Sequence, residues 1–195
     1  MPEPDIAKPK VGVLALQGAF REHRLALERL GASVTEIRLP EQLTGLAGVV
    51  IPGGESTTVT KLMVAYGFDT ALLEFHAQGG AVWGTCAGAI VIAADVLGRP
   101  AQLKLSLLDI SVDRNAYGRQ VASFEVDVAM EGFAKPFGAV FIRAPRITRA
   151  GPDVTILASY GPDPILVRQD RVLASVFHPE LSGDDRVHQY FLDML

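Results

Sequence analysis

The sequence predicts an α/β protein with a doubly wound mixed sheet flanked by helices, and three observations support this prediction. Residues 11–16 form a continuous apolar run, which is typical of a strand buried on both faces of a sheet. Further short apolar runs alternate with helical stretches through the first half of the chain, as in parallel α/β sheets. After residue 97 the pattern changes to short apolar runs separated by polar or Gly/Pro turns. The second half is therefore expected to form an antiparallel extension with few helices.

The individual elements follow from apolar patterning and from the residues that end each run. In the first half we expect strands at 11–16, 34–39, 48–51 and 80–85. Helices are expected at 21–30, from an N-cap at Ser56 or Thr57 to about 66, at 68–78 and at 87–97. Short strands in the second half are expected at 105–112, 121–128, 139–142, 155–160, 164–168 and 172–177. A capping box at 182–185 predicts a last helix that runs to about residue 195.

Composition and charge narrow the class of protein. The 195 residues, 49% of them apolar and 21% charged, fit one globular domain, which we expect over 11–195. Residues 1–10 are polar, carry three prolines and lack the apolar core of a signal peptide, so a flexible N-terminal extension is expected there. A net charge of −4 argues against nucleic acid and anionic membranes as partners, and no apolar run reaches membrane-spanning length. The single cysteine excludes an internal disulfide and a thiolate metal cluster, so we expect no metal, no cofactor and a reducing, cytoplasmic location.

The only cysteine, Cys86, lies where an apolar strand turns sharply into a helix. Gly84 and Gly88 flank it at G-x-C-x-G spacing, the thiol form of the nucleophile elbow, where small neighbours let a strained turn close. The N-terminus of the following helix would favour the reactive thiolate, and the N–H of Ala87 is a candidate oxyanion donor. The alternative is that Cys86 is a small buried hydrophobic residue, and the elbow alone does not decide between the two.

A nucleophilic thiol needs a base, and His178 is the best candidate among four histidines. It follows the apolar run 172–177, and the ends of strands are where open α/β sheets place functional groups. Pro179 favours an extended backbone at His178, which would direct Glu180 to the same side to orient the ring. The alternative is a strand-end histidine and a solvated glutamate. The remaining histidines, which fall in predicted helices, are His23, His76 and His188. A surface position is expected for His76 and His188.

Residues 52–57 lie where a predicted buried strand ends and a helix begins. Adjacent glycines allow the backbone to turn an N–H toward a reacting carbonyl, so Gly54 is a candidate second oxyanion donor. The alternatives are a phosphate-binding loop and a plain tight turn. The P-loop lysine is missing, and Glu55 would repel a phosphate but suit an ammonium group.

In the second half of the chain, Arg114 and Arg143 are candidates for holding a substrate carboxylate. An ordinary surface position stays open for both of them and is the one expected for Arg119.

The segments GTCAG at 84–88 and FHPE at 177–180 resemble the motifs of the class I, triad-type glutamine amidotransferases. The finer resemblance is to the glutaminase subunit of pyridoxal 5′-phosphate synthase. It rests on LALQGAFREH at 14–23, PGGESTT at 52–58, RNAYGRQ at 114–120 and FIRAP at 141–145. These segments follow the family's order from residue 11 to the C-terminus. The resemblance implies the class I amidotransferase fold, with a flavodoxin-like core.

By this resemblance, Cys86 attacks the side-chain amide of L-glutamine, His178 transfers the proton and Glu180 orients His178. The oxyanion hole would use Gly54 and Ala87. The glutamine pocket would be lined by Gly54, Glu55, Ser56, Arg114, Ile142 and Arg143. The products would be glutamate and ammonia, with the ammonia passed to a (β/α)-barrel synthase subunit that builds pyridoxal phosphate. A change at the 53–54 peptide on docking would prevent wasteful hydrolysis of glutamine.

Three other functions stay open on the sequence. The first is a glutaminase subunit of another synthase, such as imidazole glycerol phosphate synthase, although the finer motifs argue against it. The second is a stand-alone cysteine hydrolase, which would be fully active without a partner. The third is a non-catalytic binding module with a vestigial triad, and the intact Cys86, His178 and Glu180 argue against that.

Overall fold

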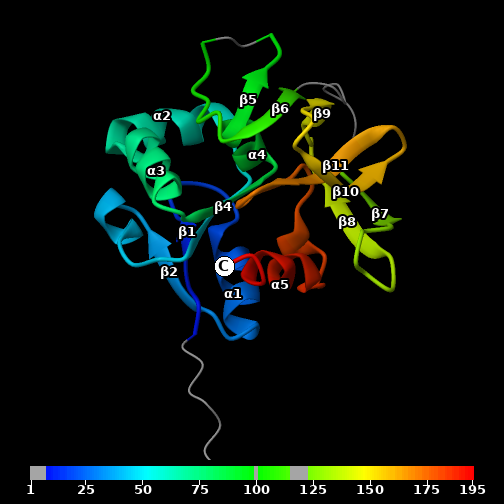
Figure 1. Cartoon of the computed structure of the whole chain (residues 1–195), viewed down its shortest axis with the longest axis horizontal. Coiled ribbons are helices and arrows are strands. Elements are labelled where there is room, and N and C mark those ends of the chain that lie inside the picture. Colours follow the sequence, from blue (N-terminus) through cyan, green and yellow to red (C-terminus); the bar gives the residue numbers. More distant parts are fainter. Residues whose placement is uncertain (1–7, 99–100, 115–122) are drawn as a thin grey trace, which may run out of the picture.

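The computed structural model describes residues 8–98, 101–114 and 123–195, and at its centre lies a seven-stranded sheet (Figure 1). The strand order is β10-β11-β12-β4-β3-β1-β2; the strands from β12 to β2 are parallel, and β10 and β11 are antiparallel at one edge. These strands are β1 (Lys10–Leu14), β2 (Ser33–Ile37), β3 (Gly48–Ile51), β4 (Ala81–Thr85), β10 (Thr155–Tyr160), β11 (Asp163–Gln169) and β12 (Val172–Ser175). The predicted mixed sheet is confirmed.

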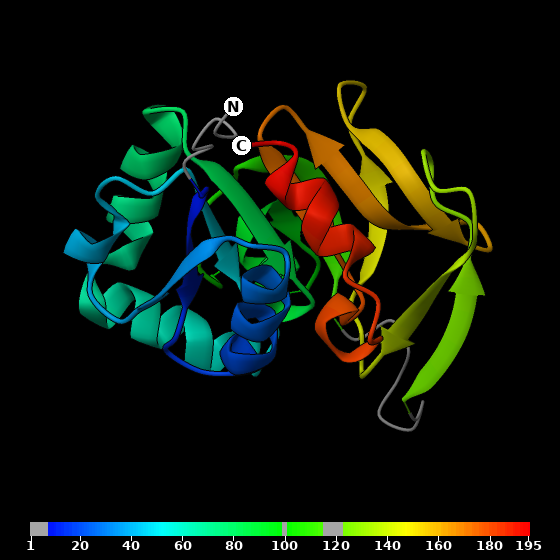
Figure 2. The ribbon, with the colours of Figure 1, turned by 90° about the horizontal axis from the view of Figure 1, so that it is seen from below.

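Helices cover both faces of this sheet. Helix α1 (Phe20–Arg29) packs against α5 (Arg186–Leu192), whereas α2 (Ser56–Tyr66) packs against α3 (Phe68–Ala77) and α4 (Ala87–Ile92). In Figure 1 the central strands run between these two groups, and Figure 2 shows α1 and α5 side by side. With both faces covered, β3, β4 and β12 are buried along their whole length, which explains their apolar sequences.

The second half of the chain adds two small sheets, as the change of pattern after residue 97 predicts. One contains β5 (Ala93–Val96), β6 (Leu108–Asp113) and β9 (Arg146–Ala150), with β6 and β9 antiparallel. The other is the antiparallel pair β7 (Phe124–Val128) and β8 (Phe137–Phe141). Strand β9 was not predicted, because the sequence RITRA has neither an apolar run nor a sustained alternation of polar and apolar residues. Residues 121 and 122 of the predicted strand 121–128 lie outside the described residues.

The helix predicted over 87–97 is wrong in its second half. Helix α4 ends at Ile92, and the next four residues form β5, which pairs with β6. The carbonyls of Val91 and Ile92 accept hydrogen bonds from the N–H groups of Leu105 and Leu107, at 2.8 and 3.0 Å. Because these carbonyls are taken by a distant segment, the helix cannot continue through them.

The two ends of the chain also differ from expectation. Residues 1–7 of the predicted extension lie outside the described residues, whereas Lys10 already belongs to β1 and pairs with Ser33. The predicted capping box at 182–185 is not formed: the Ser182 oxygen accepts from the N–H of Asp184, and Asp185 is the N-cap of α5, with no side-chain cap. A short 3₁₀ helix, η2 (Pro179–Leu181), precedes that turn, and another, η1 (Pro40–Leu43), links β2 to β3.

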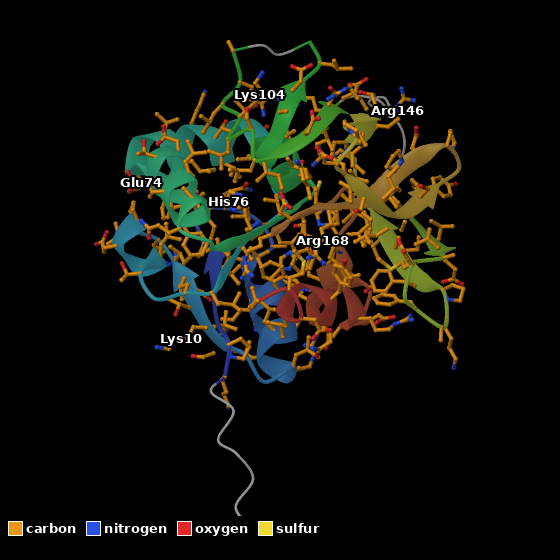
Figure 3. The ribbon with its side chains drawn as sticks, viewed as in Figure 1. Lys10, Glu74, His76, Lys104, Arg146 and Arg168 are labelled. Atoms are coloured by element: carbon orange, nitrogen blue, oxygen red, sulfur yellow. The ribbon has the colours of Figure 1, made fainter. Side chains whose placement is uncertain are left out.

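Helix α5 contacts the sheet through a polar side chain as well as through its buried side. Arg168 of β11, labelled in Figure 3, donates from Nη1 to the hydroxyl of Tyr190 on α5 at 3.2 Å. The buried side of the helix places Phe191 against Trp83 of β4, with ring centroids 5.4 Å apart.

Within the described residues, no helix is long and apolar enough to cross a membrane.

Candidate active site

The carboxyl ends of four parallel strands meet at one cavity of about 540 Å³. The segments after β1, β3, β4 and β12 all reach it, and the sheet order reverses between β1 and β3, which is where open α/β sheets bind their ligands. The cavity lining includes nine of the ten residues that the resemblance assigns: Gly54, Glu55, Ser56, Cys86, Ala87, Arg114, Ile142, Arg143 and His178. The tenth, Glu180, lies behind His178.

Cys86 occupies the strained turn that the glycine spacing predicts. Its φ is 48°, a left-handed conformation that few side-chain-bearing residues adopt. A Cβ at Gly84 would lie 2.5 Å from the carbonyl of Gly88, and a Cβ at Gly88 would lie 2.0 Å from the carbonyl oxygen of Ile51. Both glycines are therefore required for the turn to close. The thiol group belongs to a residue that is only 7% exposed but lines the cavity.

His178 and Glu180 form the predicted pair, but by a different local geometry. His178 Nδ1 donates to Glu180 Oε1 at 2.7 Å. The backbone after His178 is not extended as predicted, since Pro179 opens the 3₁₀ turn η2 and the turn brings Glu180 back under the ring. Burial lowers the pKa of His178, but hydrogen bonds and charge interactions with Cys86 and Glu180 outweigh it and raise the pKa to about 10. The imidazole therefore favours its protonated form beside the thiol.

The 53–54 peptide packs directly on the Cys86–His178 pair. A Cβ at Gly53 would lie 2.6 Å from Cε1 of His178 and 3.1 Å from Cβ of Cys86. The N–H of Gly53 donates to Thr85 Oγ1 at 2.9 Å, and its carbonyl accepts from the N–H of Ala19 at 3.2 Å. Gly53 is therefore held on both sides, through its N–H and through its carbonyl.

Gln17 is a cavity residue to which the sequence analysis gave no role. It follows β1, and its Oε1 accepts from the N–H of Glu55 at 2.9 Å. The same oxygen would lie 2.3 Å from a Cβ at Gly54, so the side chain supports the glycine loop closely. Its position at the carboxyl end of a buried parallel strand is the feature of the sequence that could have indicated a role for Gln17. Arg119, for which a surface position was expected, lies outside the described residues.

Glu55 is the N-cap of α2, so the prediction of Ser56 or Thr57 as the cap is wrong. Its carboxylate accepts from the N–H groups of Thr57 and Thr58, at 3.0 and 2.8 Å, because its longer side chain reaches back over the first turn. Burial raises the pKa of Glu55, but the hydrogen bonds from Thr57 and Thr58 together outweigh it and lower the pKa to about 2. Arg114 lies 3.5 Å from the same carboxylate, which joins both residues at the cavity edge.

We expect Glu55→Ala to lower the free energy of unfolding by about 1 kcal/mol, because α2 loses its N-cap. Urea denaturation at neutral pH measures the loss. The matched control is Glu74→Ala on the exposed side of α3, labelled in Figure 3, which should change stability by less than about 0.5 kcal/mol. Equal losses in the two variants would contradict a capping role.

Two histidines outside the cavity are completely buried. His23 on α1 and His188 on α5 are both 0% exposed, so the prediction of a surface position for His188 is wrong. The reason is the packing of α1 on α5, which the polar neighbours of His188 in sequence do not reveal. His23 Nδ1 and His188 Nε2 are 3.0 Å apart, and both rings contact Trp83. His76 is half-buried and bonds the carbonyl of Gly80.

Burial lowers the pKa of His188 to about 3, so the folded protein should lose stability as the pH falls. The unfolded chain binds this proton near the ordinary pKa of 6.5 and the folded chain does not. The contribution of this group to the free energy of unfolding is therefore complete above pH 6.5 and decreases as the pH falls toward 3. Denaturation at a series of pH values should show a slope of up to about 1.4 kcal/mol per pH unit from this group. His188→Gln should have a shallower slope, and an unchanged slope would contradict this origin.

The fold and the cavity together define a class of protein, the glutamine amidotransferases. A solved structure described as "Crystal structure of glutamine amidotransferase" superposes with a TM-score of 0.90 at 52% identity, covering 94% of this chain and 97% of that chain. The structure of PurLQS from Thermotoga maritima has a TM-score of 0.69 at 20% identity, over 95% of this chain and 98% of that chain. The latter shows a shared fold.

Within that class, the chain belongs to the SNO glutamine amidotransferase family, whose model matches residues 13–195. A relative from Deinococcus radiodurans is 57% identical over 188 residues, covering 94% of this chain and 96% of the relative. A relative from Thermus thermophilus is 54% identical over 185 residues, with the same coverage of both chains. Both relatives bear the name "Pyridoxal 5′-phosphate synthase subunit PdxT".

Proposed function

We propose that this chain is the glutaminase subunit of a pyridoxal 5′-phosphate synthase, hydrolysing L-glutamine to L-glutamate and ammonia. The observation that carries the proposal is Cys86 at a strained turn, facing a cavity and paired with a His178 that Glu180 holds. The names of relatives 54–57% identical over nearly the whole chain agree with it.

The mechanism uses the residues of the cavity in two half-reactions. The sulfur of Cys86 attacks the side-chain carbonyl carbon of glutamine, while the N–H groups of Gly54 and Ala87 stabilise the oxyanion. The carbon–nitrogen bond breaks as the imidazolium of His178 gives its proton to the leaving ammonia. Water then attacks the γ-glutamyl thioester, His178 takes a proton from it, and glutamate leaves as the thiolate returns. Glu180 holds the His178 ring throughout.

The substrate groups that do not react would be held at the cavity edge. Arg114 and Arg143 would bind the α-carboxylate of glutamine, with Ile142 against its methylenes and Ser56 beside Glu55. The Glu55 carboxylate carries its negative charge at neutral pH, which suits the α-ammonium group.

The name of the relatives also implies a partner, and we propose that ammonia passes unreleased to a (β/α)-barrel synthase subunit. The 53–54 peptide is the proposed place where docking completes the oxyanion hole. A nucleophilic thiol needs a reducing compartment, so we also propose a cytoplasmic location.

The decisive experiment measures glutamate release by the purified chain, alone and with a pyridoxal phosphate synthase barrel subunit, with Cys86→Ala as the control. Release that appears or rises sharply with the partner and is absent in Cys86→Ala supports the proposal. Equal release without the partner supports a stand-alone hydrolase. Absence of release in both mixtures contradicts the proposed function.

A further inference from the structure

A chain of buried polar groups continues behind the triad, beyond the cavity. His23, on the first turn of α1, is 0% exposed and does not line the cavity. Its Nε2 lies 3.3 Å from Glu180 Oε2 and 3.2 Å from Thr85 Oγ1. The ring of His23 therefore contacts two groups, Glu180 and Thr85, which lie in two different parts of the active site.

The first part is the Glu180–His178 pair. Glu180 uses Oε1 for His178, and its Oε2, fully buried, accepts no hydrogen bond of good geometry from the described residues. His23 Nε2 lies 3.3 Å from that oxygen. Because a carboxylate accepts and never donates, the nitrogen facing it must bear a proton. The contacts with His23 and His178 outweigh burial and hold the pKa of Glu180 below its ordinary value.

The second part is the glycine loop. Thr85 Oγ1, which contacts His23 Nε2, also accepts the hydrogen bond from the N–H of Gly53. The carbonyl of Gly53 accepts from Ala19, the N-cap of the same helix that carries His23. Helix α1 therefore contacts Gly53 on both sides: its backbone binds the Gly53 carbonyl, and His23 reaches the Gly53 N–H through Thr85.

We propose that His23 is a positioning residue of the glutaminase reaction, which fixes the Glu180 carboxylate and the Thr85 hydroxyl relative to each other. By doing so it keeps the His178 ring and the Gly53 peptide in register around Cys86. The inference rests on the proposed function for its reaction, although the contacts stand without it. His23 touches no substrate, so its loss should alter kcat and leave KM for glutamine unchanged.

Two variants separate the contacts of the two ring nitrogens. The side-chain nitrogen of glutamine reaches the place of the histidine Nε2, so His23→Gln keeps a donor for Glu180 and Thr85. Asparagine reaches only the place of Nδ1, so His23→Asn keeps the contact with His188 and loses the contacts with Glu180 and Thr85. Both variants lose an aromatic ring against Trp83, which matches them for packing.

The test assays both variants in complex with the barrel subunit. We expect His23→Asn to lower kcat by at least about 10-fold and His23→Gln to recover most of that loss, both at unchanged KM. Equal kcat values for the two variants, or values that follow only their thermal stability, would overturn the proposal. Thr85→Val and Thr85→Ser form a second pair, in which only the serine keeps an acceptor for Gly53.

A second readout needs neither the partner nor glutamine. Cys86 is the only cysteine in the sequence, so its alkylation by iodoacetamide reports the surroundings of one thiol. We expect slower alkylation in His23→Asn than in His23→Gln, and identical rates would overturn the positioning role. If wild-type protein alkylates but releases no glutamate with the partner, the proposed function fails while this comparison still decides the role of His23.

Discussion

Gly53→Ala is expected to reduce glutaminase activity by at least about 100-fold while leaving the chain folded. The added methyl group would lie 2.6 Å from Cε1 of His178, closer than real Cβ contacts allow, and 3.1 Å from Cβ of Cys86. Gly53 does not have a positive φ, so alanine adds no backbone strain and the side chain of His178 must move instead. A shift of about 1 Å in His178, the proposed catalytic base, is enough to cause a loss of this size.

The matched control for this variant is Gly138→Ala on β8. The nearest atom to a Cβ there is Asp127 Oδ1 at 3.9 Å, an ordinary contact, and Gly138 does not line the cavity. Both variants should have thermal unfolding midpoints near that of the wild type, and only Gly53→Ala should lose activity in the complex. Activity of Gly53→Ala within about threefold of the wild type would show that His178 has room to move.

The position of the site was predictable because it follows from local patterns and from topology. Parallel strands end at one edge of a sheet, so the polar segments after the apolar runs 11–16, 48–51 and 172–177 had to meet. The spacing around Cys86 was informative for a steric reason, since neither Gly84 nor Gly88 has space for a side chain. The resemblance to a family then supplied the candidate glutamine-binding residues, which local chemistry alone left undecided.

The features that the sequence did not reveal depend on contacts between distant segments. Strand β5 forms because residues 105–107 take the last carbonyls of α4, and no pattern within 87–97 contains that information. His188 has polar neighbours in sequence but lies beneath α1. His23 belonged to a recognised motif, yet its contacts with Thr85 and Glu180 span 62 and 157 positions of the chain, and only the fold brings them together.

Glu180→Gln is expected to lower kcat by about 100-fold or more, with the fold retained. Glu180 Oε1 accepts the Nδ1 proton of His178 at 2.7 Å, and its charge contributes to the raised pKa of that ring. Glutamine removes the charge and offers an amide donor to the same nitrogen, which disfavours the tautomer that serves as base. Glu125→Gln, on the exposed face of β7, is the control and should retain wild-type activity.

Glu180→Gln should also differ from the wild type in how the free energy of unfolding depends on pH. The raised pKa of His178 stabilises the folded state fully below 6.5, and that contribution is lost as the pH rises through about 10. The lowered pKa of Glu180 contributes above its ordinary value of 4.5 and is lost as the pH falls below it. The stability advantage of the wild type over Glu180→Gln should therefore be largest between pH 4.5 and 6.5 and decline on both sides. Urea denaturation at pH 5.5 and pH 9 tests this, and an equal difference at both would show that the charge pair does not contribute as the geometry indicates.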